Sequence, residues 1–90
     1  MPSFLNTALF LTAEYIFEGG TSAECDKFVR WIRRTAQKHG KWKEHDWTAQ
    51  LVAMSLGGEA LRWHSKLDPE TADHWPTLLR ALLDQYSDPK

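Results

Sequence analysis

Four histidines and one cysteine are the side chains of this sequence best suited to bind a metal ion. They are Cys25, His39, His45, His64 and His74. Zinc sites on a helix place two ligands four residues apart, and other zinc sites use C-x-x-C or H-x₃-H pairs. None of these spacings occurs in the sequence. We therefore expect no metal site and no cofactor.

Catalytic chemistry has no stronger signal. No nucleophile motif surrounds any serine, and Ser55, Ser65, Asp68 and His74 are typical of cap, turn or surface positions. The pair Gly57-Gly58 follows no strand and precedes no lysine in the register of a phosphate-binding loop, so it indicates a corner between two helices. We expect a protein that is not an enzyme.

A basic segment is the strongest local electrostatic feature. Its candidate phosphate or RNA contacts are Arg30, Arg34, Lys38, Lys41 and Lys43. Cations beside the neighbouring tryptophans Trp31 and Trp42 are suited to bind phosphates and bases. The alternative is an ordinary solvated helix face, and it is favoured because charged stripes opposite a core are routine. The formal net charge of −1 also ranks RNA binding lower. We expect weak RNA binding at most.

The length and composition of the chain indicate one small domain that must position these residues. The chain has 90 residues, of which 42% are hydrophobic, with five tryptophans and a single cysteine. That length supports one modest core, and one cysteine excludes an internal disulfide, as in a reducing compartment. No apolar run approaches the roughly 18 residues of a membrane span. We expect an intracellular, cytoplasmic protein without a membrane partner.

Apolar periodicity predicts an all-α fold of four helices near 22–39, 46–56, 58–67 and 73–86. The sequence TSAE at Thr21 matches a capping box for the first helix, and Gly40 ends that helix in the left-handed conformation. Asp46 is the expected N-cap of the second helix, and Asp68 before Pro69 ends the third. The fourth is expected to begin at Asp73, which places Pro76 in its first turn.

Residues 1–18 are predicted to form an N-terminal arm ahead of a helical lobe at 19–90. Their pattern fits a helix in part and alternates like a strand toward its end, so the arm is expected to be extended or partly strand-like. The predicted core is Phe28, Ile32, Leu51, Leu61, Trp63, Trp75, Leu79 and Leu82. A four-helix core of this size covers only part of the apolar arm, so the arm is the expected surface for self-association or ligand contact. Its contact residues are Phe4, Phe10, Leu11, Tyr15 and Phe17.

Several of these residues occur in an order that resembles a known family. The pattern comprises Phe17-x-Gly19 before a capped helix, Phe28 with Trp31-Ile32, the stretch LGGEALRWHSKL at 56–67, and Trp75-Pro76-x-Leu78 with Tyr86. It resembles the Gag domain of gypsy-class LTR retrotransposons, over about Tyr15 to Ser87. That domain is the N-terminal lobe of a capsid protein, and the family includes domesticated relatives such as the neuronal protein Arc.

The resemblance implies a small helical capsid lobe without enzymatic activity. The expected function is capsid-like assembly through self-association, with the chain itself as partner in a homo-oligomer or dimer, within capsid-like particles. The alternative is a monomeric adaptor similar to the Arc lobe, which binds a peptide in a groove between the arm and the helices. RNA binding through the basic segment is the third possibility.

Overall fold

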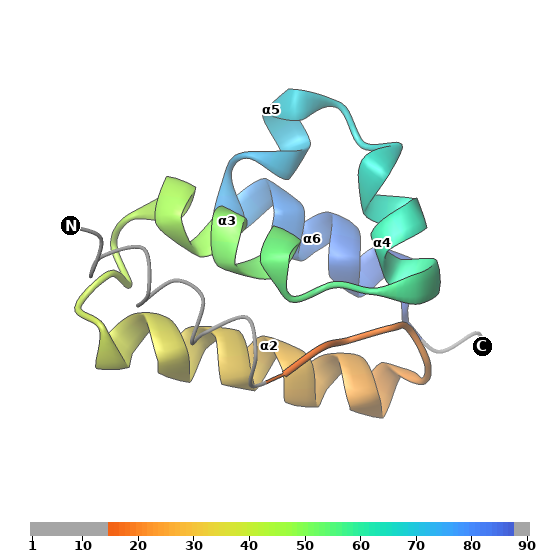
Figure 1. The fold of residues 1–90 in the computed structure, drawn as a ribbon, viewed down its shortest axis with the longest axis horizontal. Coiled ribbons are helices and arrows are strands. Elements are labelled where there is room, and N and C mark those ends of the chain that lie inside the picture. Colours follow the sequence, from red (N-terminus) through yellow and green to blue (C-terminus); the bar gives the residue numbers. More distant parts are fainter. Residues whose placement is uncertain (1–14, 88–90) are drawn as a thin grey trace, which may run out of the picture.

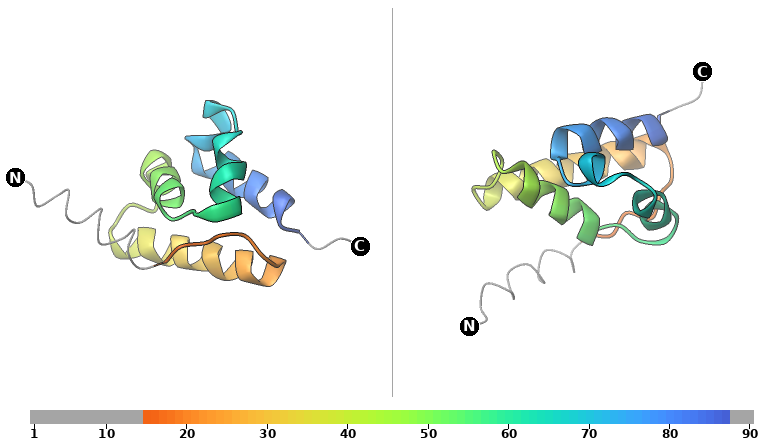
Figure 2. Two further views of the ribbon diagram at one scale, coloured as in Figure 1. Left: turned by 45° about the vertical axis from the view of Figure 1, so that its right-hand side comes forward. Right: turned by 90° about the horizontal axis from the view of Figure 1, so that it is seen from above.

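The computed structural model describes residues 15–87 and consists of helices with no sheet in that range, which confirms the all-α prediction (Figure 1). The helices are α2 (Ser22–Lys38), α3 (His45–Met54), α4 (Gly58–Ser65), α5 (Pro69–Ala72) and α6 (Trp75–Gln85). Helix α2 lies along one side of the molecule, α3 and α6 pack against it, and α5 lies on the far side (Figures 1 and 2). The core therefore sits between α2 and the pair α3 and α6.

Helix α2 begins and ends with the predicted signals. The Thr21 hydroxyl accepts a hydrogen bond from the Glu24 amide at 3.2 Å, and the Glu24 carboxylate accepts one from the Thr21 amide at 3.4 Å. At the other end, Gly40 has φ +68°, its N–H donates to the Gln37 carbonyl at 3.0 Å, and the Lys41 N–H donates to the Ala36 carbonyl at 2.8 Å. These two bonds form a Schellman motif, which a left-handed glycine permits.

Helix α3 begins earlier than predicted. Its N-cap is Glu44, whose side chain makes no capping bond and pairs instead with Lys41 at 3.6 Å. The expectation that Asp46 caps this helix is wrong, because Asp46 lies within the first turn. A carboxylate there still interacts favourably with the positive end of the helix.

The two glycines between α3 and α4 serve different purposes. Gly57 is the N-cap of α4 in extended conformation, and a Cβ on it would lie 2.9 Å from Cγ2 of Ile16. Gly58 has φ +52°, a region that is costly for other residues. The predicted helix-to-helix corner is therefore confirmed, with one glycine admitting a close neighbour and the other admitting the turn.

A short helix separates α4 from α6 and was not predicted. Asp68 is extended, as expected before Pro69, but it is also the N-cap of the four-residue helix α5, and its Oδ1 accepts a hydrogen bond from the Thr71 hydroxyl at 2.9 Å. Helix α6 then begins at Trp75 rather than at Asp73, with its proline in the first turn. The chain bends here because a first-turn proline has no N–H to continue a preceding helix.

Residues 15–18 pack into the helical core as a short extended segment. Phe17 forms an isolated parallel bridge with Leu56: its N–H donates to the Ser55 carbonyl at 2.8 Å, and its carbonyl accepts from the Gly57 N–H at 3.0 Å. The Phe17 ring stacks on Phe28 with centroids 5.0 Å apart. This end of the predicted arm is therefore strand-like and belongs to the packed unit.

Most of the predicted core is buried, with one clear exception. Phe28, Ile32, Leu51, Trp75 and Leu82 are all buried. Trp63 and Leu79 are half-buried and pack against this cluster. The prediction for Leu61 is wrong, because 46% of it is exposed: Ala60 instead turns inward from α4.

Candidate interaction surfaces

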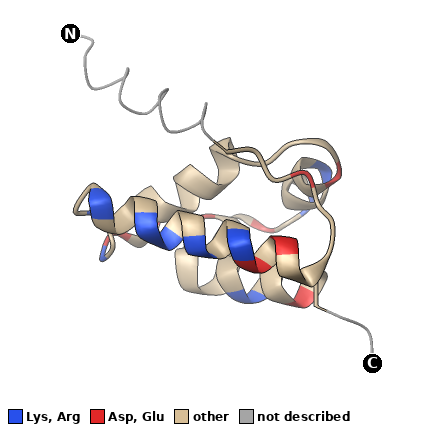
Figure 3. Cartoon of the chain, turned by 90° about the horizontal axis from the view of Figure 1, so that it is seen from below, with Lys and Arg blue, Asp and Glu red and all other residues tan. Residues whose placement is uncertain are grey.

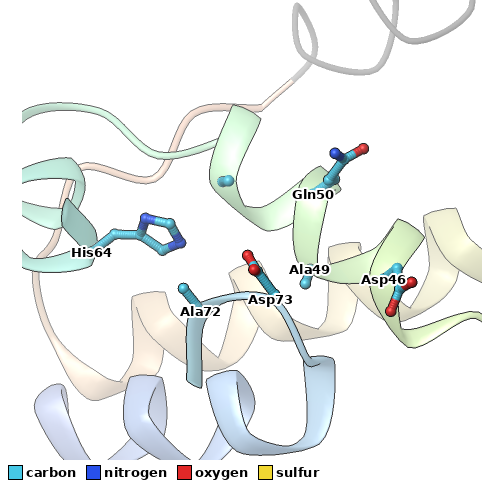
Figure 4. Close-up of a pocket in the computed structure, with 7 residues that line it drawn as sticks. Asp46, Ala49, Gln50, His64, Ala72 and Asp73 are labelled. Atoms are coloured by element: carbon cyan, nitrogen blue, oxygen red, sulfur yellow. The ribbon is translucent and has the colours of Figure 1, made fainter. Parts of the chain in front are cut away.

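A hollow of about 340 Å³ opens between α3, α4 and the α5–α6 turn (Figure 4). Its lining residues are Asp46, Ala49, Gln50, Ala53, His64, Ala72 and Asp73. The imidazole of His64 and the carboxylate of Asp73 both point into it, whereas Asp46 lies toward its other end (Figure 4). We call this feature the α3–α5 hollow. This hollow was not predicted, because its residues come from elements that only tertiary packing brings together.

His64 is the polar group of this hollow with an unmet hydrogen bond. Its Nε2 is buried and has no hydrogen-bond partner among the described residues. Burial lowers the pKa of His64, and the nearby Asp73 carboxylate acts in the opposite direction. A neutral imidazole beside the Asp73 carboxylate suits a cationic hydrogen-bond donor. The residues that line the hollow include no serine, threonine, cysteine or lysine.

The burial and the raised pKa of Cys25 both make its thiol unreactive near neutral pH. It is 1% exposed, and burial, followed by the neighbouring Asp26 carboxylate, raises its pKa to about 11. A thiol reacts as the thiolate, so this side chain is mostly protonated near neutral pH. Its expected place in the core is confirmed.

Histidines meet at one place that the sequence did not reveal. The rings of His45 and His74 lie edge to face, with centroids 4.8 Å apart, although 28 residues separate them in the chain. No group of three or more histidine, cysteine or acidic side chains is placed to hold a metal ion within residues 15–87. Two rings alone supply fewer ligands than the zinc sites of proteins use.

The predicted basic residues fall into two groups. Arg30, Arg34 and Lys38 are exposed on α2, opposite its buried stripe. Figure 3 shows the Lys and Arg positions in blue along this helix. Lys41 and Lys43 lie in the loop after α2, where Lys41 pairs with Glu44 and Lys43 lies 4.9 Å from the centre of the Trp42 ring.

Two further cations belong with the helical group. Lys27 and Arg33 are also exposed on α2. The basic face of α2 is defined here as Lys27, Arg30, Arg33, Arg34 and Lys38. At about 1.5 Å per residue, it extends over roughly 16 Å.

The predicted N-terminal contact residues are divided by the structure. Phe4, Phe10 and Leu11 lie outside the described residues. Phe17 is 3% exposed, so the expectation that it remains available for a partner is wrong. Tyr15 is half-buried and contacts Phe28 and Trp31, with centroids 5.6 and 5.2 Å apart. Both side chains pack against the core of their own chain.

Other apolar side chains are exposed instead. Among the large apolar side chains of residues 15–87, those with at least 40% exposure are Ile16, Trp42, Met54, Leu61 and Leu83. Trp42, at 56%, borders a hollow of about 250 Å³ formed with Arg33, Gln37 and Trp75 near the end of α2. Leu83 borders a second hollow of about 250 Å³ with Cys25 and Asp26 near the start of α2. Large apolar side chains thus flank both ends of this helix.

One edge of the segment 15–18 has no backbone hydrogen-bond partner within residues 15–87, and we call it the free edge. The Phe17 N–H and carbonyl both face residues 55–57, so the backbone groups of Ile16 and Glu18 point away from that pairing. Within the described part of the chain, no backbone hydrogen bond reaches Ile16 or Glu18. A hollow of about 210 Å³ runs along this segment and is bordered by Glu24 and Lys27.

Comparison with known proteins identifies no relative of this chain. No family model, curated protein or solved structure matches the chain. A search of the described residues for a helix long and apolar enough to cross a membrane found none.

Proposed function

We propose that this chain is a non-enzymatic, capsid-like assembly module of the retrotransposon Gag type, which acts through self-association. The proposal starts from the ordered sequence motifs between Tyr15 and Ser87. The Gly57-Gly58 motif forms a helix corner, and seven of the motif side chains are core residues: Phe17, Phe28, Ile32, Leu56, Ala60, Trp75 and Leu78. A compact helical lobe is consistent with the proposal, although many unrelated proteins share such an architecture.

The observation that carries the proposal is the exposure of large apolar side chains at both ends of α2. Trp42 is 56% exposed near one end and Leu83 is 40% exposed near the other. Tryptophan in particular is enriched in protein interfaces. Two separate contact points suit an assembling module, because each copy is then able to contact two neighbours.

The contacts of such a module are individually weak. A small interface gives a low affinity, and many such interfaces repeated by symmetry still hold a large assembly together. The lobe on its own is therefore expected to associate only at high protein concentration. Its place of action, like that of other intracellular assemblies, is the cytoplasm.

Light scattering on substituted chains tests this proposal. The changes Trp42→Ser and Leu83→Ser each remove one exposed apolar side chain, and Gln37→Ser is the matched control on an exposed polar residue near Trp42. We expect either apolar substitution to lower the average mass at high concentration, with the control unchanged. A wild-type mass equal to that of the monomer, with no effect of either substitution, contradicts self-association through these residues.

A peptide-binding adaptor is the second candidate, and the free edge of residues 15–18 favours it. An extended peptide is able to add to an unpaired edge through main-chain hydrogen bonds. The adjacent hollow of about 210 Å³ offers space for a side chain of that peptide. In this case, an extended apolar peptide shifts the backbone amide resonances of Ile16 and Glu18 while the chain remains monomeric.

A further inference from the structure

Positive and negative charges are segregated along the chain. Residues 27–43 contain seven basic side chains and no acidic one. Residues 44–87 contain seven acidic side chains, Glu44, Asp46, Glu59, Asp68, Glu70, Asp73 and Asp84, against three basic ones. The formal net charge of −1 therefore conceals two oppositely charged regions.

The fold keeps the two regions apart in space. Helix α2, which carries the basic face, lies along one side of the molecule, and α5 lies on the opposite side (Figure 1). Within residues 15–87, the one ion pair is Lys41 with Glu44, at 3.6 Å. The cations of the basic face consequently have no carboxylate partner within that part of the chain.

The acidic region has a definite centre around α5. Asp68 and Glu70 are exposed on this short helix and at its cap, and Asp46 and Asp73 line the α3–α5 hollow. We call these four residues the acidic side. The unpartnered Nε2 of His64 and the side chain of Gln50 border the same hollow. The hollow thus offers two carboxylates and further acceptors to an incoming lysine or arginine.

We propose that the basic face of α2 in one copy docks on the acidic side of a second copy, so that copies associate head to tail. This inference rests on the proposed function and adds an electrostatic contact to the apolar contacts proposed at Trp42 and Leu83. The two surfaces are different, so each copy in a pair retains one unused surface, and further copies add until a ring closes or a filament grows. The small net charge opposes this assembly little.

A second copy matches the charges better than a nucleic acid does. A strand of phosphates would also be attracted to the basic face. Extended beyond that face, however, the same strand meets acidic regions at residues 18–26 and 44–87. A second copy presents a compact acidic surface, with its own basic face directed elsewhere.

Charge reversal on the full chain tests the inference. One variant carries Arg30→Glu, Arg34→Glu and Lys38→Glu, and a second carries Asp46→Lys, Glu70→Lys and Asp73→Lys. Each variant alone then presents two surfaces of like charge and is expected to remain monomeric in sedimentation velocity. An equimolar mixture restores the native pairing and is expected to form complexes. A chain with all six changes is the matched control. Its α2 face then has a net charge of −1 and its α5 side one of +2, so the two surfaces are again complementary, and it is expected to associate more strongly than either single variant but more weakly than the wild type.

Salt dependence of the wild type provides a test without substitutions. Raising NaCl from about 0.05 M to about 1 M shortens the screening length to ~3 Å, and we expect association to weaken at least about tenfold. Circular dichroism checks that each variant folds. If a reversed variant does not, the changes Arg30→Gln, Arg34→Gln and Lys38→Gln remove the charges more mildly, and they are also expected to weaken association.

The outcomes separate this inference from the proposed function. Association that is insensitive to salt, or a mixture of reversed variants that stays monomeric, overturns the head-to-tail contact while self-association stands. A basic-face variant that loses binding to a single-stranded RNA oligonucleotide but associates like the wild type assigns the face to nucleic acid and overturns the inference. A wild type that is monomeric at every salt concentration overturns the proposed function and the inference together.

Discussion

Replacing Phe17 by alanine tests whether the segment 15–18 is part of the core. The Phe17 ring is 3% exposed, stacks on Phe28 at 5.0 Å and meets the edge of Tyr86 at 5.1 Å between ring centroids. Truncating a buried phenylalanine costs about 3–5 kcal/mol in unfolding free energy, from lost burial and the cavity that remains. For a domain of this size, about 4–8 °C of melting temperature accompany each kcal/mol, so the melting temperature is expected to fall by at least about 12 °C.

The neighbouring residue supplies the control. Ile16 is 47% exposed, so only about half of the roughly 1.5–3 kcal/mol for burying such a side chain is lost in Ile16→Ala, or about 1 kcal/mol. Urea unfolding followed by tryptophan fluorescence measures both variants, with the slope of free energy against urea checked for constancy. A cost under about 1 kcal/mol for Phe17→Ala, or equal costs for the two substitutions, refutes this placement of the segment.

Three further predictions concern other residues. The pKa of His64 is lowered in the folded chain, so the folded state favours its neutral form. The stability that this side chain contributes is present above the unfolded pKa near 6.5 and is lost as the pH falls through the folded pKa. The urea midpoints at neutral and mildly acidic pH should therefore differ less in His64→Gln than in the wild type. Cys25, with its pKa at about 11 and 1% exposure, should react slowly with a thiol reagent in the native state and rapidly in denaturant, and fast native labelling would contradict its burial. Thr21→Ala should cost about 1 kcal/mol in unfolding free energy through loss of the capping box, whereas the exposed Ser65→Ala should cost less than about 0.5 kcal/mol, and equal costs would argue against the cap.

Local signals predicted the elements that depend on local chemistry. Helix α2 carries its own cap at Thr21 and Glu24 and its own stop at Gly40, so its bounds were predicted to within one residue. Helix α5 was missed because four residues are too few to show a helical period, and Pro69 reads first as a break.

Which side chains are buried was harder to predict than which residues form helices. Leu61 sits beside the apolar stripe of α4, and whether such a position faces the core depends on how the helix is rotated against α6, which the pattern does not specify. The alternation of Tyr15 and Phe17 indicated a strand, yet its pairing with Leu56 depends on a corner almost forty residues away. The arm was consequently predicted to contact a partner, whereas residues 15–18 pack against the core of their own chain.

One of the candidate surfaces was partly predicted from the sequence, and another was not. The basic face was partly predicted because Arg30, Arg34 and Lys38 recur at helical spacing. The α3–α5 hollow was not, because His64 and Asp73 meet only after α4 and α5 fold back on α3.

Sedimentation velocity of the intact wild-type chain over a series of protein concentrations tests self-association most directly. We predict a weight-average sedimentation coefficient that increases with concentration at low salt, because exposed apolar side chains at both ends of α2 and the segregated charges favour contact between copies. A coefficient that stays at the monomer value up to the highest concentration would contradict the proposal that this chain is an assembly module.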